Sequence, residues 1–425
     1  MGGKETSEVL MNLGKYSFGV GDRFGKQGKA QLAAMVEAGK VGVEITPVWN
    51  KSHREHTIIG TKPAAVRAEA DEAAKEMLWE QAYFVDADHI NLKNVDLFLE
   101  ASDFFTLDVA DYIGQSSPKD QIDNFIDGCV KYIDGLTVPG IEGNLIVTES
   151  VVRTIGNKYL FAVKQAGEIY RHIVSKKGVG SFVVEMSMDE TDMPQSPVEL
   201  FFILAAAAQE EIPIQTVAPK FSGRFNKGVD YVGDVEQFAR EFEQDLAVIA
   251  YAVEEFGLPK NLKLSVHSGS DKFSIYKAMN KAIKKFDAGL HVKTAGTTWL
   301  EELAGLALAE GNGLRIAKQI YAEAFKRMDE LTKPYATVID IDKGRLPSPD
   351  VVAEWNGRRF AEALRHDQSC GRYNPDLRQL LHVGYKVAAE LQREFTDVVA
   401  DCERIIGPNV TENIYDRHIK PIFID

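Results

Sequence analysis

Apolar and polar positions follow two alternating patterns along the chain. Short runs rich in β-branched and aromatic residues are separated by longer stretches rich in Ala, Glu, Lys and Leu. The long stretches, such as 64–81 and 234–256, have the spacing of amphipathic helices, whereas the short runs have the length of buried strands. The short runs are 16–20, 41–45, 83–88, 104–108, 182–188, 214–218, 262–267 and 290–293.

Strands that alternate with helices predict crossover connections and a parallel sheet. Eight such strands predict an α/β fold of the (β/α)8 TIM-barrel type, which needs about 250 residues. We assign residues 1–298 to this catalytic barrel, with a long insert between the fourth and fifth strands. Residues 299–425 have mostly helical patterns. We expect them to form a C-terminal helical appendage that covers the barrel and contributes to its site.

Composition and charge narrow the class of protein. The chain has 425 residues, of which 45% are hydrophobic and 26% charged, as in soluble globular proteins. A net charge of −14 argues against nucleic acid and anionic membranes as partners. The three cysteines lie far apart without metal-ligand spacing, which fits a cytoplasmic location. The sequence leaves open whether the chain forms a homo-oligomer.

Polar side chains follow seven of the eight predicted strands, at the end where each strand finishes. In (β/α)8 enzymes the catalytic groups lie at the carboxyl ends of the strands. One polar loop carries little weight, but the recurrence at the same end predicts a shared site. The residues are Asp22, Arg23, Asp88, His89, Asp108, Asp189, Glu190, Lys220, His267 and Lys293.

The third strand ends in "DADH", residues 86–89. Side chains alternate along a strand, so Asp86 and Asp88 share a face, and His89 points the other way unless the strand has ended. An Asp–His pair can divide the work of a metal site, with imidazole as ligand and carboxylate as base. The alternative is a helix N-cap, in which the Asp accepts backbone N–H bonds.

The seventh strand leads into "HSGSDK", residues 267–272. Imidazole is the commonest protein ligand for metals, so His267 is a candidate ligand. Ser268, Ser270 and Asp271 are candidates for binding the hydroxyl groups of a substrate. The alternative is a capping turn with a hydrogen-bonded core histidine.

The fifth strand is followed by "DETDMPQSP", residues 189–197, where two prolines restrict the loop. Glu190 is a candidate ligand or acid–base group, whereas Asp189 and Asp192 are expected to cap the loop or support the ligands. Glu185 lies within the strand, so it must be paired if it faces inward.

Basic groups and one further histidine complete the candidates. Arg23 and Lys293 are candidates for binding a substrate carboxylate, because a guanidinium matches a carboxylate geometrically and an ammonium matches it in charge. Asp108 is a candidate for substrate binding at the end of the fourth strand. His382, in the C-terminal region, is a candidate third metal ligand. Neither Rossmann nor P-loop glycine spacing occurs.

Six motifs together resemble the tagaturonate epimerase family. They lie between residues 18 and 385 and cover most of the chain: "FGVGDRFG", "DADH", "MDETDMPQSP", "KLSVHSGSDKFSIY", "HVKTAGTTWLE" and "RQLLHVGY". The resemblance implies an isomerase of hexuronate breakdown that interconverts tagaturonate and fructuronate with a divalent metal. Tyr112 departs from the family, since the resemblance implies a histidine at this position.

The "DADH" and "VHSGSD" motifs also resemble the metal-dependent class II aldolases. That resemblance implies His89 and His267 as ligands and Asp88 as base. The chemistry agrees, because the stereocentre that separates the two sugar acids is β to the ketone. Removing a proton α to the ketone cannot invert it, whereas a retro-aldol cleavage followed by re-formation of the bond can.

The sequence therefore predicts a metal-dependent sugar-acid epimerase. Asp88 and Glu190 are the catalytic candidates, and His89, His267 and His382 the metal ligands. The metal can be Zn, Mn, Ni, Co or Fe, since such ligands suit all of them. Two alternatives stay open: a class II aldolase-like lyase, which releases its fragments, and a non-catalytic sugar-binding subunit.

Overall fold

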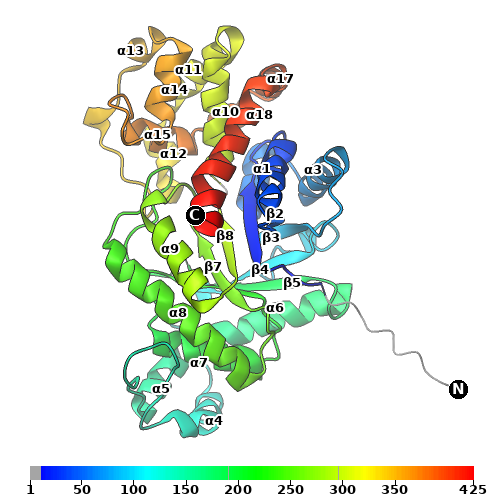
Figure 1. The fold of residues 1–425 in the computed structure, drawn as a ribbon, viewed down its shortest axis with the longest axis vertical. Coiled ribbons are helices and arrows are strands. Elements are labelled where there is room, and N and C mark those ends of the chain that lie inside the picture. Colours follow the sequence, from blue (N-terminus) through cyan, green and yellow to red (C-terminus); the bar gives the residue numbers. More distant parts are fainter. Residues whose placement is uncertain (1–10, 190, 295) are drawn as a thin grey trace, which may run out of the picture.

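Eight parallel strands close into a barrel in the order β1 to β8 (Figure 1). The computed structural model describes residues 11–189, 191–294 and 296–425. Each strand pairs with its sequence neighbours, and β8 pairs with β1 to complete the closure. The predicted TIM-type fold is confirmed. The strands are β1 Tyr16–Gly21, β2 Thr46–Ser52, β3 Phe84–Ile90, β4 Phe104–Asp108, β5 Val183–Ser187, β6 Thr216–Ala218, β7 Lys263–His267 and β8 Leu290–Lys293.

Helices follow the strands and form the outer ring. The predicted long insert between β4 and β5 is present and lies at one end of the molecule with α4 and α5 (Figure 1). The helices of this part are α1 Gly28–Lys40, α2 His53–Ile59, α3 Pro63–Glu76, η1 Val95–Leu97, η2 Ala110–Tyr112, α4 Lys119–Cys129, η3 Val130–Tyr132, α5 Glu149–Ile155, η4 Gly156–Leu160, α6 Phe161–Lys177, α7 Pro197–Gln209, α8 Val235–Phe256 and α9 Phe273–Phe286.

The C-terminal region is helical, as predicted. Its elements are α10 Thr297–Leu308, α11 Gly311–Lys326, α12 Met328–Thr332, η5 Lys333–Tyr335, η6 Lys343–Arg345, α13 Pro349–Ala353, α14 Gly357–Leu364, α15 Pro375–Val383, α16 Tyr385–Glu390, α17 Arg393–Asp401, α18 Glu403–Ile414 and η7 Tyr415–Ile424. Among the residues described, no helix combines the length and apolar character needed to cross a membrane.

The end of the chain returns to the barrel. The segments α18 and η7 pack against α1, and η7 also packs against α9, between the first and last helices of the ring (Figure 1). Asn280 of α9 donates a hydrogen bond to the Ile422 carbonyl, and Thr411 of α18 donates one to the Ala30 carbonyl. The division at residue 298 stays a prediction, and these contacts join the last residues of the C-terminal region to the barrel wall.

The predicted position of the second strand is wrong. Residues 41–45 follow the end of α1, where Val41 is exposed and Gly42 has a φ of +84°. The strand is instead β2, which contains Pro47 and buries the polar side chains of Asn50 and Lys51. Proline and buried polar groups are unusual in strands. The apolar "VGVEI" run therefore matches the sequence pattern of a strand more closely than the residues of β2 do.

The barrel interior changes from apolar to charged along its axis. Near the amino ends of the strands a small apolar cluster fills the interior. Two residues further along several of the same strands, the inward-facing side chains are polar and buried. This change places a set of charged groups close to the carboxyl ends, where (β/α)8 enzymes hold their sites. The apolar cluster is Leu13, Val48, Phe84, Phe104 and Val183.

Candidate metal centre and active site

An irregularity in β3 places His89 in the barrel mouth. The pairing of β3 with β4 shifts between Ala87 and Ile90, and His89 has a φ of +53°. In a regular strand His89 would face away from Asp88. The bulge instead brings the imidazole near two carboxylates: Nε2 lies 3.8 Å from Asp88 Oδ1, and Nδ1 lies 3.6 Å from Asp108 Oδ2. The strand thus continues past His89 and still delivers both side chains of the motif to one side.

Lys293, at the end of β8, lies at the centre of the buried charges. Its Nζ is 2.7 Å from Asp86 Oδ2, 2.8 Å from Glu185 Oε1 and 3.0 Å from Asp88 Oδ1. It also lies 2.6 Å from the Thr106 hydroxyl, which in turn donates to Asp86. One ammonium therefore holds three carboxylates together, so the buried charges of β3, β5 and β8 neutralise one another.

His267, at the end of β7, lies between two carboxylates. Its Nε2 is 2.8 Å from Glu185 Oε1, and its Nδ1 is 3.1 Å from Asp189 Oδ2. Glu185 is fully buried and faces inward, so the expectation that it must be paired is confirmed. The Glu185 contact orients the imidazole and fixes Nε2 as the proton donor. Nδ1 then faces Asp189 and is the ring nitrogen left for a metal ion.

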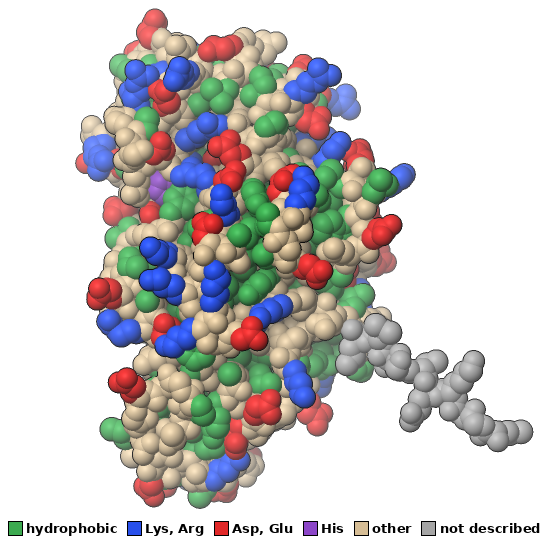
Figure 2. Space-filling model, in the orientation of Figure 1, with side chains coloured by type: hydrophobic (Ala, Val, Ile, Leu, Met, Phe, Trp, Pro, Cys, Tyr) green, Lys and Arg blue, Asp and Glu red, His purple; other side chains and the backbone are tan. Residues whose placement is uncertain are grey.

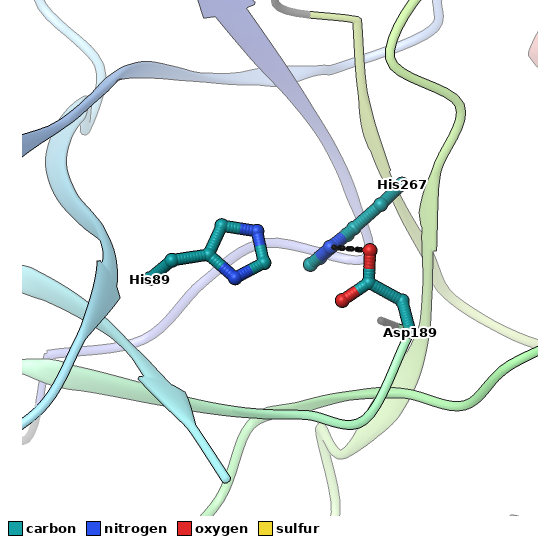
Figure 3. A group of neighbouring side chains, drawn as sticks. All are labelled: His89, Asp189 and His267. Atoms are coloured by element: carbon teal, nitrogen blue, oxygen red, sulfur yellow. Dashed lines mark ion pairs between the residues drawn. The ribbon is translucent and has the colours of Figure 1, made fainter. Parts of the chain in front are cut away.

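His89, Asp189 and His267 form a group that can hold a metal ion. One ligand atom from each of them lies within 4.8 Å of the others, and the three side chains point toward one another from separate strand ends (Figure 3). Nδ1 of His89 and Nδ1 of His267 are buried and make no hydrogen bond of good geometry, although each faces a carboxylate, that of Asp108 and that of Asp189. Two imidazoles and a carboxylate are donors that suit Zn and other divalent transition metals, so the residues fit such an ion.

Electrostatics around the two imidazoles agree with a cation site. Burial alone would lower the pKa of His89, but the carboxylates of Asp88, Asp108 and Asp189 outweigh it and raise the pKa to about 10. Burial likewise opposes the charged form of His267, yet Asp189 and Glu185 raise its pKa to about 9. The surrounding carboxylates thus stabilise positive charge at this point, which a metal ion supplies in place of two protons.

The carboxylates near Lys293 differ in protonation. Burial raises the pKa of Asp86 to about 7 despite the ammonium beside it. Burial acts on Asp88 in the same direction, but Lys293, His89 and His267 reverse the shift and lower its pKa to about 2. Asp88 is therefore ionised at neutral pH. Its side chain is 14% exposed, whereas the side chain of Asp86 is inaccessible, so only Asp88 of the two can meet a substrate.

A cavity of about 420 Å³ opens beside this group. His267 and Asp189 line it from the barrel, and Tyr335 and Val338 line it from the C-terminal region. A larger cavity of about 760 Å³ lies between α1 and α18, outside the barrel. Hydrophobic side chains gather near the middle of the face in Figure 2, amid interspersed charges, where these two helices meet. The smaller cavity is the candidate active site, because His267 and Asp189 of the titratable cluster line it.

Several predicted residues lie elsewhere or have other partners. Arg23 forms an ion pair with Glu55, and its guanidinium stacks on the Tyr385 ring. His382 lies outside the His89–Asp189–His267 group and borders Gly296, where any side chain would overlap the imidazole.

The loop after β7 is largely buried. The Ser268 hydroxyl donates to the Lys293 carbonyl, and the Ser270 hydroxyl accepts from the Gly228 amide. Asp271 is fully buried among Arg378, His366 and His418. The polar side-chain atoms of Ser268, Ser270 and Asp271 are therefore engaged by other groups of the protein.

Two more positions complete the placement. Glu190 lies outside the described residues. Tyr112, which stands where the family resemblance implies a histidine, lies in η2 beyond β4 and packs on Phe161.

The structure gives Asp189 a different place from the one expected. It lies with the two histidines, 3.1 Å from His267 Nδ1, and can itself be a ligand, whereas the sequence left it as a residue that caps the loop or supports the ligands. The sequence patterns gave no role to Asp86 and Thr106, which hold Lys293, or to Arg54 and Lys227, which line the cavity. A usable signal was present for Asp86, because an acidic residue inside an apolar strand must have a partner.

Comparisons with known proteins agree on one family. A model of the tagaturonate epimerase family matches residues 5–402. A tagaturonate/fructuronate epimerase of Thermotoga maritima is 27% identical over 426 residues, which covers 95% of this chain and 80% of that protein. A solved structure of fructuronate-tagaturonate epimerase UxaE from Cohnella laeviribosi, complexed with one glycerol, has a TM-score of 0.79 at 22% identity, covering 97% of this chain and 82% of that one. The native structure of that enzyme gives a TM-score of 0.77 at 22% identity, covering 97% and 83%.

Proposed function

The chain belongs to the tagaturonate epimerase family, a family of isomerases, and on that premise we propose that it interconverts tagaturonate and fructuronate with a divalent metal. The match of the family model to residues 5–402 carries this proposal. The cluster of His89, Asp189 and His267 beside an ionised Asp88 supports it, because these are the groups that a metal-assisted aldol reaction needs.

The reaction follows from the position of the inverted carbon. This carbon is β to the ketone and carries a hydroxyl group. Loss of the hydroxyl proton allows the bond between the α and β carbons to break, which leaves an aldehyde and an enediolate. Rotation of the aldehyde and re-formation of the bond on its other face invert the centre. The proton then returns to the new hydroxyl, so no atom is gained or lost.

Asp88 is the proposed base. Lys293 and the two imidazoles keep it ionised at neutral pH, and its partial exposure lets a substrate hydroxyl reach it. A base with a pKa of about 2 is weak in water, so the hydroxyl must lose its proton to Asp88 while negative charge is stabilised elsewhere. Lys293 contributes to this cost, because its ammonium stabilises the ionised form of Asp88 more than the protonated form.

His89, His267 and Asp189 are the proposed metal ligands. A divalent ion bound there would supply a Lewis acid for the ketone oxygen. Glu185 orients His267 through Nε2, and the bulge in β3 orients His89. Such fixed ligand geometry matters, because groups that orient metal-ligating histidines tune affinity and activity.

The direct test follows both sugar acids by proton NMR. Purified protein incubated with tagaturonate should produce fructuronate, and the reverse reaction should reach the same equilibrium. A chelator should stop the reaction, and adding back a divalent metal should restore it. The proposal fails if the metal-loaded protein leaves both compounds unchanged. It also fails in its metal part if the metal-free protein keeps full activity.

The same assay separates an epimerase from a lyase. A lyase releases the two fragments, so an aldehyde trap added to the reaction would consume the substrate. The proposed epimerase holds both fragments until the bond re-forms, so the trap should leave the yield of epimer unchanged.

A further inference from the structure

A keto sugar acid brings a carboxylate that the neutral sugar of the same skeleton lacks. The cations first expected to bind it are both paired within the protein. Arg23 is matched by Glu55 and covered by Tyr385. Lys293 faces three carboxylates and is almost completely buried. Neither offers an unneutralised charge to a substrate anion, so another cation is needed at the mouth.

Lys220 lies in the right place for this role. It follows β6 by two residues, at the carboxyl end of the barrel, and lines the same cavity as His267 and Asp189. Its side chain is half-buried, and among the residues that the structure describes it forms no ion pair or side-chain hydrogen bond. An ammonium in such a position interacts more strongly with an anion than one on the open surface does.

The backbone of Lys220 is tied to the loop that carries Asp189. The Lys220 amide donates to Gln195 Oε1 at 2.7 Å, and Gln195 Nε2 donates to the Thr191 hydroxyl at 3.0 Å. Gln195 is itself buried, with 7% of its surface exposed. The loop after β5 and the start of the loop after β6 therefore form one unit, which fixes the lysine relative to the proposed metal ligand.

Other basic groups around the cavity have partners of their own. The Arg54 guanidinium lies over the Tyr335 ring, 5.1 Å from its centre. Arg224 lies 3.4 Å from Asp340 of the C-terminal region. Lys227 adds a further positive charge to the lining. The side of the cavity formed by the loop after β6 is thus rich in positive charge, and Lys220 is the member of that side that directly follows the strand.

We propose that Lys220 binds the carboxylate of the substrate and so makes the site selective for a sugar acid over the neutral sugar. This inference rests on the proposed function and deepens it. The carboxylate and the ketone lie toward opposite ends of the carbon chain. The ketone is thereby directed to the His89–Asp189–His267 group while the carboxylate reaches Lys220 across the cavity.

The test compares Lys220→Met with the wild type on two matched ligands. One is the keto sugar acid, and the other is the neutral ketohexose in which a hydroxymethyl group replaces the carboxylate. Dissociation constants come from calorimetry with metal-loaded protein, and kcat/KM is measured for the acid. A charge-assisted hydrogen bond of this kind corresponds to about a 10- to 100-fold change. We expect that loss for the acid, affinity for the neutral sugar within about twofold, and partial recovery in Lys220→Arg.

Controls separate this inference from the function on which it rests. Lys260→Met makes the same change on the α8–β7 connection, at the opposite end of the barrel, and should match the wild type on both ligands. Equal losses for the acid and the neutral sugar in Lys220→Met would overturn the inference, as would an unchanged affinity for the acid. If the wild type binds the acid without epimerising it, the proposed function fails. The ratio of the affinities for the acid and for the neutral sugar still tests the role of Lys220.

Discussion

Oε1 of Glu185 lies 2.8 Å from Nε2 of His267 in the buried mouth of the barrel. Because this contact occupies Nε2, the other ring nitrogen faces Asp189 and is the one left for a metal ion. The same carboxylate oxygen also lies 2.8 Å from the Lys293 ammonium. Glu185 thus connects the proposed metal ligands with the charge network around the proposed base, and it does so without access to substrate.

Glu185→Gln should weaken metal binding without removing a ligand. The neutral amide oxygen accepts the Nε2 proton of His267 more weakly than the carboxylate does, and a negative charge next to the cation site is lost. Loss of such an orienting carboxylate typically costs 10- to 100-fold in metal affinity. Titration with a divalent metal and a competing chelator measures the effect. Glu254→Gln, at an exposed position of α8, makes the same change as a control and should bind metal like the wild type.

Metal content should separate the three histidines that the sequence offered as ligands. His89→Ala and His267→Ala each remove a member of the cluster, so neither variant should retain a stoichiometric divalent ion after gel filtration. His382→Ala should retain it, because that imidazole lies outside the group. Elemental analysis of the three purified variants measures the metal bound per chain and so shows which histidines are ligands. A metal-free His382→Ala with intact metal in His89→Ala would reverse the assignment.

Asp88→Asn should abolish turnover while leaving the metal in place. Loss of a positioned general base typically lowers the rate by 10² to 10⁴. The amide keeps the shape of the side chain, and Lys293 retains Asp86 and Glu185 as partners. Single-turnover kinetics and metal content are measured on the same sample. Asp108→Asn is the matched comparison, since Asp108 also contacts His89, and it should lower kcat much less.

The barrel could be predicted because its signal is spread over many residues. Seven of the eight strands lie within a few residues of their predicted positions, since their apolar runs are buried on both faces. β2 could not be located, because Asn50 and Lys51 are buried by contacts that form only in the closed barrel. Local preference cannot report such contacts.

The sequence predicted which residues belong to the site better than it predicted which of them contact one another. His89 and His267 stand at strand ends, and the structure brings them together with Asp189. The bulge that turns His89 inward depends on the pairing of β3 with β4, which no spacing rule reveals. Likewise Arg23 has a carboxylate partner contributed by another element, so sequence alone left it as a candidate for substrate binding.

His291, at the amino half of β8, should make the protein sensitive to acid. Burial lowers the pKa of its imidazole to about 3, below the ordinary value of 6.5. Below pH 6.5 the imidazole of His291 is protonated in the unfolded chain but stays neutral in the folded protein. The free energy of unfolding therefore falls as the pH drops from 6.5 toward 3. At pH 5 this amounts to about 2 kcal/mol. Urea unfolding measures the free energy of unfolding at pH 7 and at pH 5. Its decrease between the two pH values should be about 2 kcal/mol smaller in His291→Gln than in the wild type.

Asp271→Asn should distinguish a structural role from a role in substrate binding. Asp271 is fully buried after β7, with Arg378 Nη2 at 2.8 Å, His366 Nδ1 at 3.1 Å and His418 Nε2 at 3.2 Å. Burial opposes its charge, but these partners, chiefly Arg378, hold its pKa well below the usual range. The asparagine would leave the Arg378 guanidinium buried without its counter-charge, which typically costs 3–5 kcal/mol.

The three partners of Asp271 come from α15, from the connection between α14 and α15, and from η7, so the lost energy is that of joining the C-terminal region to the barrel. Denaturant unfolding of Asp271→Asn should therefore show the large loss, whereas Asp397→Asn, on the exposed face of α17, should unfold like the wild type. If Asp271 instead bound a substrate hydroxyl, its asparagine variant would keep wild-type stability and show only a raised KM. That outcome would require an open path from the cavity to a carboxylate with no exposed surface, so we expect the loss of stability.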